Sequence, residues 1–555
     1  MINPIVLTVA DYISSNDYIF KSITIYSNYI LLIMPLIGIF CSKLFKRKYE
    51  ILWIILCAIL FIFIKIPTLF EVYLNPDEGM HLSVAQALYN GGGIFLSADA
   101  TTLGPINQIL LVLLPISGVG TLFSARLLAL LLEIISFILI FKSISKYSDI
   151  FSSYVLSVYF LLYTALFTAD IIAFNCETTL CFFASLYLYF SSKKISIVNK
   201  WLEFFTIGVL PFIKLQYLPI AAILFLISFI KVIKWNENNL SILKKFSTIL
   251  GVVICFGILF MYSLINGSVE YFYKFYFVNA FAHVGSSFSF YLNNLLNLVN
   301  TFSSYIEFWP SVILLIVTSI EIIFLSSLIG IKFIKEKCLY ILLLFTVVFC
   351  VTRPLQAFNH YLNIIVVFSI IVYSYVCRDI KKYERSFDYK LFLNRFNFFL
   401  FYIISVVLLD SSQKCDIDWH YSVIMNSKYS SIWQIISDDI YLDSNENDKI
   451  VVWGWQNEIY DFARRQSATA QVNIERIVNN KYPMFNITKY VDDIKHNNPK
   501  FILDVVSPIS FGFSSENFRI INYDFMNEIM SEYAVYKEYE VQGGKIIMYK
   551  RKNSD

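Results

Sequence analysis

Charged residues are scarce in this sequence, and their scarcity excludes most kinds of soluble protein. Only 15% of the residues are Asp, Glu, Lys or Arg, whereas a soluble domain usually has about 25%. Hydrophobic residues make up 57% of the chain and aromatic residues 18%. The net charge of +3 comes from basic residues dispersed among apolar runs, so it indicates no nucleic-acid partner. The composition predicts that lipid surrounds most of the chain.

The sequence also lacks the cysteine spacings of a metal or redox motif. None of its 9 cysteines forms a CxxC pair, which excludes a zinc ribbon and a thioredoxin-like site. Most of them stand in or beside apolar runs, where they are expected to pack as small apolar side chains, and only Cys415 belongs to a polar region. No cleavable signal peptide is expected, because the first residues lack a basic segment followed at once by an apolar core.

Long apolar runs are the main feature that the chain does have. A helix needs about 20 apolar residues to cross the hydrocarbon core of a bilayer. The sequence therefore predicts an all-α polytopic membrane bundle of about 11 to 13 transmembrane helices. The candidate spans are residues 26–43, 50–67, 121–141, 151–170, 171–190, 202–217, 218–234, 246–266, 308–330, 338–352, 360–377 and 392–410. The apolar stretch 106–119 is short, and we expect a juxtamembrane or re-entrant helix there.

The distribution of lysine and arginine predicts the orientation of these spans. Basic residues gather in alternate loops, within residues 43–48, 142–146, 193–200, 231–245, 332–337 and 378–395. The loop 68–107 has no Lys or Arg, and the loop 266–306 has only Lys274. Because basic loops stay in the cytoplasm, we expect these two loops and the short loop 352–360 on the outer face.

The composition changes near Asp410, where a tail of mixed polar and apolar residues begins. We expect a transmembrane domain over residues 1–410, with a large outer loop at 68–120, and a soluble extracytoplasmic α/β domain over residues 411–555. Turn residues and apolar runs predict the tail's elements. They are strands at 450–453 and 501–505, a helix at 458–465, and a hairpin at 539–549 around Gly543-Gly544.

Three titratable residues stand together in the large outer loop. Pro76 favours a turn, and Asp77 is expected to cap a helix that continues to about residue 90, where consecutive glycines end it. Asp77, Glu78 and His81 then fall within about one helical turn. A capping acid with a solvated neighbour would be a purely structural explanation. An acidic pair in a loop without positive charge has no evident structural partner, however, which favours an acid–base site.

Cations stand at other predicted outer helix ends. Lys214 lies between two back-to-back spans, and Arg353 and His360 bracket a short outer loop. A charge at membrane depth is costly, so such residues usually face a bundle interior with a partner. Snorkelling and interfacial anchoring are the structural alternatives. Glu177 is expected inside a span, where it either balances a cation or is a hydrogen-bonded core carboxylate. The pattern predicts an acid–base site and an anion site on one face of the membrane.

In their order and sidedness, these motifs resemble those of GT-C glycosyltransferases, nearest to the bacterial protein-mannosyltransferase-like and aminoarabinose-transferase-like enzymes. The resemblance begins with Asp77-Glu78 in the first large outer loop, before a helix that ends in Gly-Gly. It extends to Ala125-Arg126-Leu127, Asn175 with Glu177, Lys214 with Gln216, His360-Tyr361-Leu362, Val451-Val452-Trp453-Gly454-Trp455, Glu458-Ile459-Tyr460 and Pro499-Lys500-Phe501-Ile502-Leu503-Asp504. It covers most of the chain. The chain departs from it in the extra apolar segment 26–43 and in Leu103-Gly104-Pro105, where relatives often have Pro-Pro.

The resemblance implies a reaction and its partners. The donor would be a sugar on a polyprenyl phosphate, and the acceptor a hydroxyl group of a glycan, lipid or protein outside a bacterial cytoplasmic membrane. No catalytic metal or other cofactor is implied, although a divalent ion stays open. Because a lipid phosphate is a good leaving group, cations and one well-placed carboxylate can suffice. The implied site comprises Asp77 as general base with Glu78, the phosphate ligands Lys214, Arg353 and His360, and the supporting residues His81, Glu177, Gln216 and Tyr361.

Three other classes of protein stay open. A polysaccharide polymerase or ligase uses similar donors but usually relies on basic residues in large outer loops. A lipid-linked substrate transporter would show inverted repeats and broken helices, which the sequence does not reveal. A non-catalytic membrane scaffold would need no carboxylate near a lipid-facing cavity.

Overall fold

The structure is a computed structural model of the whole chain. It describes residues 17–40, 47–70, 75–99, 103–113, 121–148, 150–165, 169–234, 246–283, 293, 296, 311–320, 331–352, 359–383 and 432–552. By its internal contacts the chain divides into two compact units. Unit 1 comprises Met1–Glu71, Ala129–Ile258 and Ser286–Met425, and unit 2 comprises Val72–Leu128, Leu259–Gly285 and Asn426–Asp555. The predicted domain boundary near residue 410 lies outside the described residues.

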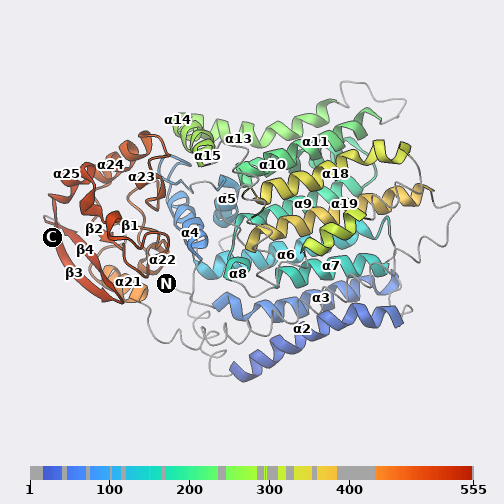
Figure 1. Cartoon of the computed structure of the whole chain (residues 1–555), viewed down its shortest axis with the longest axis horizontal. Coiled ribbons are helices and arrows are strands. Elements are labelled where there is room, and N and C mark those ends of the chain that lie inside the picture. Colours follow the sequence, from blue (N-terminus) through green and yellow to red (C-terminus); the bar gives the residue numbers. More distant parts are fainter. Residues whose placement is uncertain are drawn as a thin grey trace. The chain divides into compact units, whose positions relative to one another are not determined.

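Unit 1 is helical. Its elements are α2 (Asp17–Phe40), η2 (Arg47–Tyr49), α3 (Glu50–Lys65), η3 (Pro67–Phe70), most of α6 (Leu122–Ile144), α7 (Ile150–Thr164), α8 (Ala169–Ile172), α9 (Cys176–Ser192), α10 (Ile197–Ile213), η4 (Leu215–Tyr217), α11 (Leu218–Ile233), η5 (Thr248–Leu250), the first half of α13 (Gly251–Ile265), α18 (Ile331–Thr352), η8 (Asn359–Tyr361) and α19 (Leu362–Tyr383). Within it α9 packs against α10 and α19, and α19 packs against α18 (Figure 1). Since α7 is buried on all sides from its third residue onward, it is an inner helix of the bundle.

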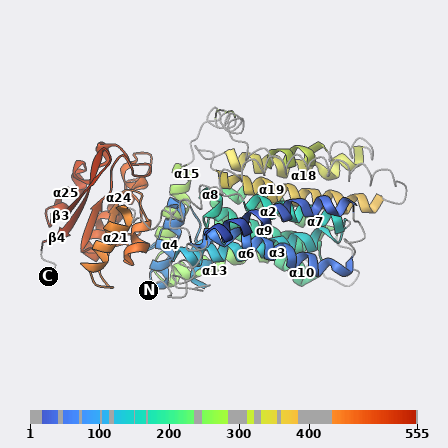
Figure 2. The ribbon, with the colours of Figure 1, turned by 90° about the horizontal axis from the view of Figure 1, so that it is seen from below.

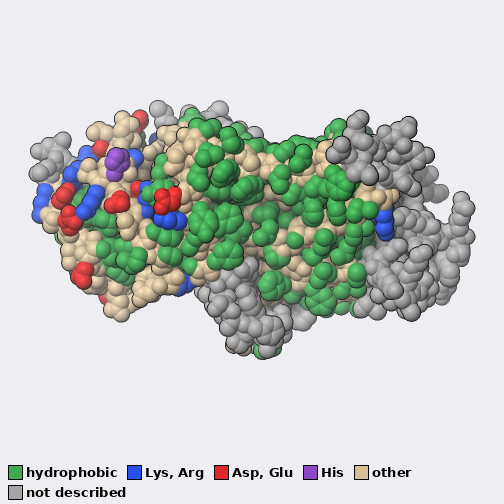
Figure 3. All heavy atoms as spheres, turned by 90° about the horizontal axis from the view of Figure 1, so that it is seen from above, with side chains coloured by type: hydrophobic (Ala, Val, Ile, Leu, Met, Phe, Trp, Pro, Cys, Tyr) green, Lys and Arg blue, Asp and Glu red, His purple; other side chains and the backbone are tan. Residues whose placement is uncertain are grey.

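Several of these helices suit a lipid environment. Three helical segments among the described residues are long and apolar enough to cross a membrane: Leu122–Ile144, Leu215–Ile233 and Thr248–Ile265. Shorter apolar helices are Ile19–Met34, Ile150–Thr164, Ser311–Ile320, Cys338–Thr352 and Leu362–Arg378. Large apolar side chains such as Ile51 and Ile258 are 73% and 61% exposed, and hydrophobic side chains cover much of the helical surface in Figure 3. Such a surface indicates contact with lipid. The predicted span 392–410 lies outside the described residues.

The prediction of an uninterrupted span over residues 171–190 is wrong. The short helix α8 ends at Ile172, and the chain leaves the helical conformation before α9 begins. The side chain of Asn175 caps α9 by accepting a hydrogen bond of 3.1 Å from a backbone N–H three residues on. Asparagine competes with a continuous helix in this way, which apolarity alone does not register. Glu177 therefore lies in the first turn of α9.

Unit 2 joins the 72–128 segment to the C-terminal tail. Its elements are α4 (Pro76–Tyr89), α5 (Pro105–Leu113), the start of α6, the end of α13, α14 (Val269–Tyr271), η6 (Phe272–Val278), α15 (Asn279–His283), α21 (Ile432–Leu442), β1 (Ile450–Trp453), α22 (Glu458–Ala463), α23 (Glu475–Val478), α24 (Phe485–Asn497), β2 (Phe501–Asp504), η10 (Glu516–Phe518), η11 (Ile520–Asn522), η12 (Asp524–Met526), α25 (Asn527–Met530), β3 (Tyr533–Val541) and β4 (Gly544–Arg551). Both predicted tail strands, the helix after the first strand and the hairpin are confirmed.

The tail contains one four-stranded sheet in the order β1-β2-β4-β3. Figure 2 shows strands β3 and β4 of this sheet. β1 and β2 are parallel, with Ile450 opposite Phe501. They therefore need a crossover connection, which the helices α22 to α24 supply. β4 pairs antiparallel with both β2 and β3. The tail is thus the small α/β domain that the sequence predicts.

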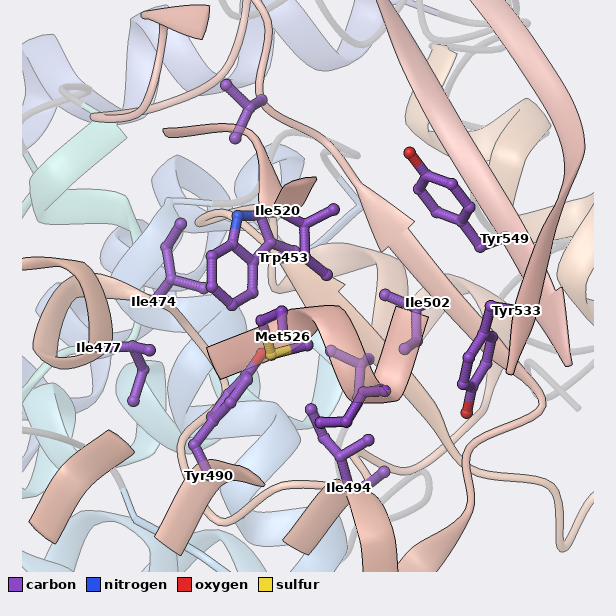
Figure 4. Close-up of a cluster of buried hydrophobic side chains, with 14 of the residues drawn as sticks. Trp453, Ile474, Ile477, Tyr490, Ile494, Ile502, Ile520, Met526, Tyr533 and Tyr549 are labelled. Carbon is purple, nitrogen blue, oxygen red and sulfur yellow. The ribbon is translucent and has the colours of Figure 1, made fainter. Parts of the chain in front are cut away.

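A single apolar cluster holds this domain together (Figure 4). Trp453 at the end of β1 is fully buried and donates its indole N–H to the Phe518 carbonyl oxygen at 2.7 Å. Tyr490 and Ile494 of α24 belong to the same cluster. Gly454 follows with φ +145, and a Cβ there would lie 2.4 Å from a methyl carbon of Val505. Only glycine fits this position, which explains the glycine between the two tryptophans at the end of β1.

Candidate active site

The candidate catalytic acids lie at the N-terminus of α4 in unit 2. Asn75 caps this helix, since its side chain accepts a hydrogen bond of 2.9 Å from the backbone N–H of Asp77. Pro76 occupies the first helical position, where its missing N–H costs nothing. The predicted helix and its end near residue 90 are confirmed, but the predicted capping role of Asp77 is wrong because Asn75 takes it. The side chain of Asp77 is half-buried, and a helix N-terminus stabilises its negative charge.

Glu78 is fully buried and bound to Arg126 near the start of α6. The guanidinium group donates from Nε to Oε1 at 3.3 Å and from NH2 to Oε2 at 3.1 Å. Arg126 is itself only 3% exposed. The expectation that the acidic pair lacks a structural partner is therefore wrong for Glu78. The pairing is not predictable from the loop alone, because Arg126 stands 48 residues away in sequence, in the next long helix.

His81 follows Asp77 by four residues, so both project from one side of α4. The His81 ring is fully buried, and its Nδ1 lies 2.8 Å from the amide nitrogen of Gln108 in α5. An amide nitrogen donates, so Nδ1 is the acceptor in this contact. The hydrogen bond fixes the ring orientation one turn behind the acids.

The C-terminal domain packs directly on this turn of α4. A Cβ on Gly79 would lie 3.1 Å from the backbone nitrogen of Glu458 and 3.2 Å from the Cβ of Asn457. Ser83, one turn later, donates to the Asn457 carbonyl oxygen at 3.4 Å. Gly79 thus permits a close approach that a larger residue would prevent. The sequence predicts the Glu458 motif, but not its place against α4.

Two further carboxyl groups of the tail belong to this neighbourhood. Burial raises the pKa of Glu458 to about 7. Burial, with the charge of Glu78 as a second cause, raises the pKa of Asp461 to about 7 as well. The Asp461 carboxylate also accepts a hydrogen bond from the backbone N–H of Leu122, the first residue of α6. The tail therefore caps the helix that carries Arg126.

A second set of candidate residues meets in unit 1, around the carboxylate of Glu177. Lys214 Nζ lies 3.6 Å from Glu177 Oε1, and His360 Nε2 lies 3.7 Å from Oε2. Tyr217 donates its hydroxyl to Oε1 at 2.5 Å. Lys214 also donates to the Tyr361 hydroxyl at 3.0 Å. Glu177 thus balances a cation, which is one of the two roles expected for it.

The remaining candidates of unit 1 fall outside this cluster or outside the described residues. Gln216 points to the end of α18, where its amide donates to the Cys350 carbonyl oxygen at 2.8 Å. Arg353 lies outside the described residues, and its assignment stays a prediction. Among the residues that the structure describes, no three His, Cys, Asp or Glu side chains form a group that could hold a metal ion.

Comparisons with known proteins place the fold. No family model matches the chain, and no curated protein matches it in sequence. Its structure is similar to that of ArnT from Cupriavidus metallidurans bound to undecaprenyl phosphate, with a TM-score of 0.52 and 10% identity over 91% of this chain and 98% of that one. The apo ArnT structure matches with a TM-score of 0.51 and 11% identity, over 88% and 97% of the two chains.

A weaker similarity, with a TM-score of 0.43 and 10% identity, relates the chain to the oligosaccharyltransferase of Archaeoglobus fulgidus, over 92% of this chain and 75% of that one. The ArnT comparison extends over nearly the whole of both chains, helices and tail alike. The chain therefore has the same fold as the ArnT structures.

Proposed function

We propose that this chain is a membrane glycosyltransferase that moves a sugar from a polyprenyl-phosphate donor to a hydroxyl acceptor on the extracytoplasmic side of a bacterial cytoplasmic membrane. The observation that carries the proposal is the different surroundings of two neighbouring acids on a GT-C fold. Glu78 is buried and neutralised by Arg126, whereas Asp77 is half-buried at a helix N-terminus. The undecaprenyl phosphate bound to ArnT supports a lipid-linked donor.

Asp77 is the general base of the proposed reaction. Its carboxylate takes the proton of the acceptor hydroxyl while that oxygen attacks the anomeric carbon of the donor sugar. The bond between the anomeric carbon and the phosphate oxygen breaks, and the polyprenyl phosphate leaves with the bonding electrons. A single displacement of this kind inverts the anomeric carbon. General-base catalysis typically contributes about 10²- to 10⁴-fold to the rate.

The position of Asp77 at the start of α4 suits a reacting carboxylate. The unpaired backbone N–H groups at the start of α4 attract negative charge. Arg126 neutralises Glu78, so the adjacent carboxylate adds little repulsion. Glu78 therefore has a structural role, in which it joins α4 to α6 through Arg126. Asp77 is the acid that reacts.

The proposed phosphate ligands are Lys214, His360 and Arg353. Phosphate oxygens accept charge-assisted hydrogen bonds from such groups, and arginine offers a fork of parallel donors. Lys214 shares its charge with Glu177, so a bound donor phosphate would draw it from an existing partner. The aromatic face of Tyr361, with the Lys214 ammonium group 4.4 Å from the ring centroid, helps to hold that cation when it moves.

The decisive experiment combines glycan analysis of a deletion strain with a transfer assay in isolated membranes. A deletion strain should lose one surface glycan modification, which mass spectrometry of lipid, protein and polysaccharide fractions identifies. Membranes with the wild-type chain should then transfer that sugar from its polyprenyl phosphate, while Asp77→Asn membranes at equal expression should not. An unaltered surface glycan in the deletion strain, or full transfer by Asp77→Asn, would contradict the proposal.

A polysaccharide polymerase or ligase is the second candidate, because it shares donors and sidedness with the first. It differs in product, since it would join whole repeat units and shift the length distribution of a polymer. A change of one sugar without a change in polymer length favours the transferase.

A further inference from the structure

A cavity of about 220 Å³ in unit 2 lies between the C-terminal end of α4 and the tail. One wall consists of Ala87, Asn90, Gly91, Gly92 and Ser97, from the end of α4 and the turn after it. The other wall consists of Lys449, residues 466–470, Asp493 and Asn497 of the tail. The cavity therefore lies on the same helix as Asp77, at its opposite end.

The lining excludes an apolar ligand. The described residues that line the cavity include no aromatic or large aliphatic side chain. Small residues such as Ala87, Gly91 and Ala470 leave the space open instead. Sites for acyl chains and aromatic ligands are lined mainly by hydrophobic and aromatic side chains, so this cavity suits a polar group.

The charged groups of the lining are few and already hydrogen-bonded, which disfavours an anion. Lys449 is the one cation among the described residues of the lining, and it donates to the Asn497 amide oxygen at 2.8 Å. The carboxylate of Asp493 accepts from the Ala470 N–H at 2.9 Å and from Lys489. A phosphate site normally gathers several cations or a guanidinium fork. An uncharged ligand fits this wall better.

The walls offer hydrogen bonds of both directions. Ser467 and Thr469 donate their hydroxyl protons to carbonyl oxygens, at 2.9 Å to Thr469 and 2.7 Å to Gln471. The Ser467 oxygen already accepts from the Thr469 backbone N–H at 3.2 Å, and the second lone pair of each hydroxyl oxygen can still accept. The half-buried amide of Gln466, which also lines the cavity, can both donate and accept. Sugar hydroxyl groups, which also do both, match such a lining.

The size of the cavity limits the ligand to one ring. The cavity has a volume of about 220 Å³. It is smaller than the roughly 300–1,000 Å³ of sites for drug-sized ligands. The 14 residues of α4 extend over about 21 Å, so a ring at this end is not the ring that reacts near Asp77.

We propose that the cavity is a subsite for a single uncharged sugar ring of a glycan acceptor, remote from the reacting hydroxyl. The inference rests on the proposed function, because it makes the acceptor a glycan of several units that α4 and the tail hold together. It gives the C-terminal domain a role in choosing the acceptor.

The test measures sugar binding separately from transfer. The purified full chain in lipid nanodiscs is titrated with methyl α-D-glucopyranoside, methyl α-D-galactopyranoside, methyl α-D-mannopyranoside and methyl N-acetyl-β-D-glucosaminide, with saturation-transfer NMR as the readout. At least one glycoside should bind saturably at millimolar concentration. Gln466→Ala, and Ala87→Phe, which fills the cavity from α4, should each weaken that binding at least tenfold. The exposed Asn480→Ala is the matched control, and inorganic phosphate should not compete.

Three results would overturn the proposal: no saturable binding to the wild-type chain, equal binding to the Gln466→Ala chain, or displacement of the glycoside by phosphate. Ala87→Phe serves as a second variant only when its thermal midpoint equals that of the wild type. Asp77→Asn should keep glycoside binding. If that variant also keeps transfer, the proposed function fails while the subsite stands. If it loses transfer and no glycoside binds the wild type, the subsite alone fails.

Discussion

Arg476 and Asp99, which are 377 residues apart in the chain, form an ion pair of 2.8 Å that is almost wholly buried. Their side chains are 1% and 0% exposed. The backbone N–H of Asp99 also donates to the Ala470 carbonyl oxygen at 2.9 Å. These contacts tie the turn after α4 to the tail. The tail thus supports the segment that carries the proposed base.

Breaking this pair should destabilise unit 2. Asp99→Ala leaves a buried guanidinium without a counter-charge, which typically costs about 3–5 kcal/mol of unfolding free energy. Arg476→Met should cost a similar amount because it leaves a buried carboxylate. The double variant should cost less than the sum, since it leaves neither charge alone. Chemical denaturation of the purified chain, followed by tryptophan fluorescence, measures these differences.

The matched control is the exposed pair of Lys495 and Glu528, whose side chains are 45% and 78% exposed. Lys495→Ala should change the unfolding free energy by at most about 1 kcal/mol. Additive costs for Asp99→Ala and Arg476→Met would show that the two side chains do not interact.

The neighbouring acids of α4 should respond differently to loss of charge. Asp77→Asn should lower turnover by about 10²- to 10⁴-fold with little change in thermal midpoint, because its side chain is half-buried. Glu78→Gln removes the counter-charge of buried Arg126, so it should lower the thermal midpoint first. Addition of Arg126→Met to Glu78→Gln should restore part of that loss. A Glu78→Gln chain of native midpoint and no turnover would instead make Glu78 catalytic.

The sequence predicts many single helices and strands because the signals for them are local. Apolar length marks helices such as α6, and the turn at Gly543-Gly544 marks the hairpin of β3 and β4. The break before α9 is not predictable from apolarity, because one asparagine side chain decides it by accepting from the backbone N–H and the hydroxyl of Thr178 at 3.1 and 3.3 Å. The sequence likewise assigned the cap of α4 to Asp77, although Asn75 stands two residues earlier.

The site was only partly predictable, since its decisive contacts join distant segments. The motif residues Arg126 and Glu458 were recognised from the resemblance, but their partners could not be read from spacing. Asp99 and Arg476 carried no signal, because an isolated acid and an isolated arginine in a polar region are ordinary surface residues. Gly79 offers a weak signal: a glycine inside a helix is costly and often marks a close packing contact.

Donor binding should depend on the cations of unit 1. Lys214→Ala and Arg353→Ala should each weaken binding of the lipid-linked donor by roughly 1.5–3 kcal/mol per lost charged hydrogen bond, which is about tenfold or more. His360→Ala should have a smaller effect if the ring stays neutral. Lys214→Ala alone leaves the Glu177 carboxylate without its lysine partner, and that negative charge could itself repel the donor phosphate. The double variant Lys214→Ala, Glu177→Gln removes this charge, so weak donor binding in it reports the loss of Lys214. The exposed Lys194→Ala is the control, and unchanged affinity in all three variants would refute the assignment.

Charge bias predicts that α4 and the tail face the same side of the membrane. Asn90→Cys and Asn480→Cys place thiols at exposed positions of unit 2, in a chain whose Cys415 is replaced by serine. An impermeant maleimide should label both in intact spheroplasts. The native Cys338, which is exposed and predicted at a cytoplasmic helix end, should react only after permeabilisation. Labelling of only one introduced thiol would mean that α4 and the tail lie on opposite sides of the membrane, and it would refute the proposed site.

Glu458 should make the stability of unit 2 depend on pH. Burial raises its pKa from 4.5 to about 7 in the folded chain, so between these values the folded state holds more protons than the unfolded state. The unfolding free energy must therefore fall as pH rises from about 4.5 to about 7, and then level off. Glu458→Gln mimics the protonated acid and should not suffer this loss. At pH 8 the variant should be more stable than the wild type, by on the order of 3 kcal/mol, and at pH 4.5 equally stable.

Asp461 titrates in a similar range, because its pKa is also raised to about 7. It is present in both the wild type and the Glu458→Gln variant. The difference between wild type and Glu458→Gln at each pH therefore isolates Glu458, provided that the two carboxyls do not interact strongly. The exposed Glu528→Gln supplies the baseline for the removal of a solvated glutamate. Thermal midpoints across pH 4.5 to 8 measure the effect. A constant difference between wild type and Glu458→Gln over that range would mean that Glu458 is ionised in the folded chain throughout. Hydrogen bonds such as that from the Gln456 amide at 3.1 Å would then compensate its buried carboxylate.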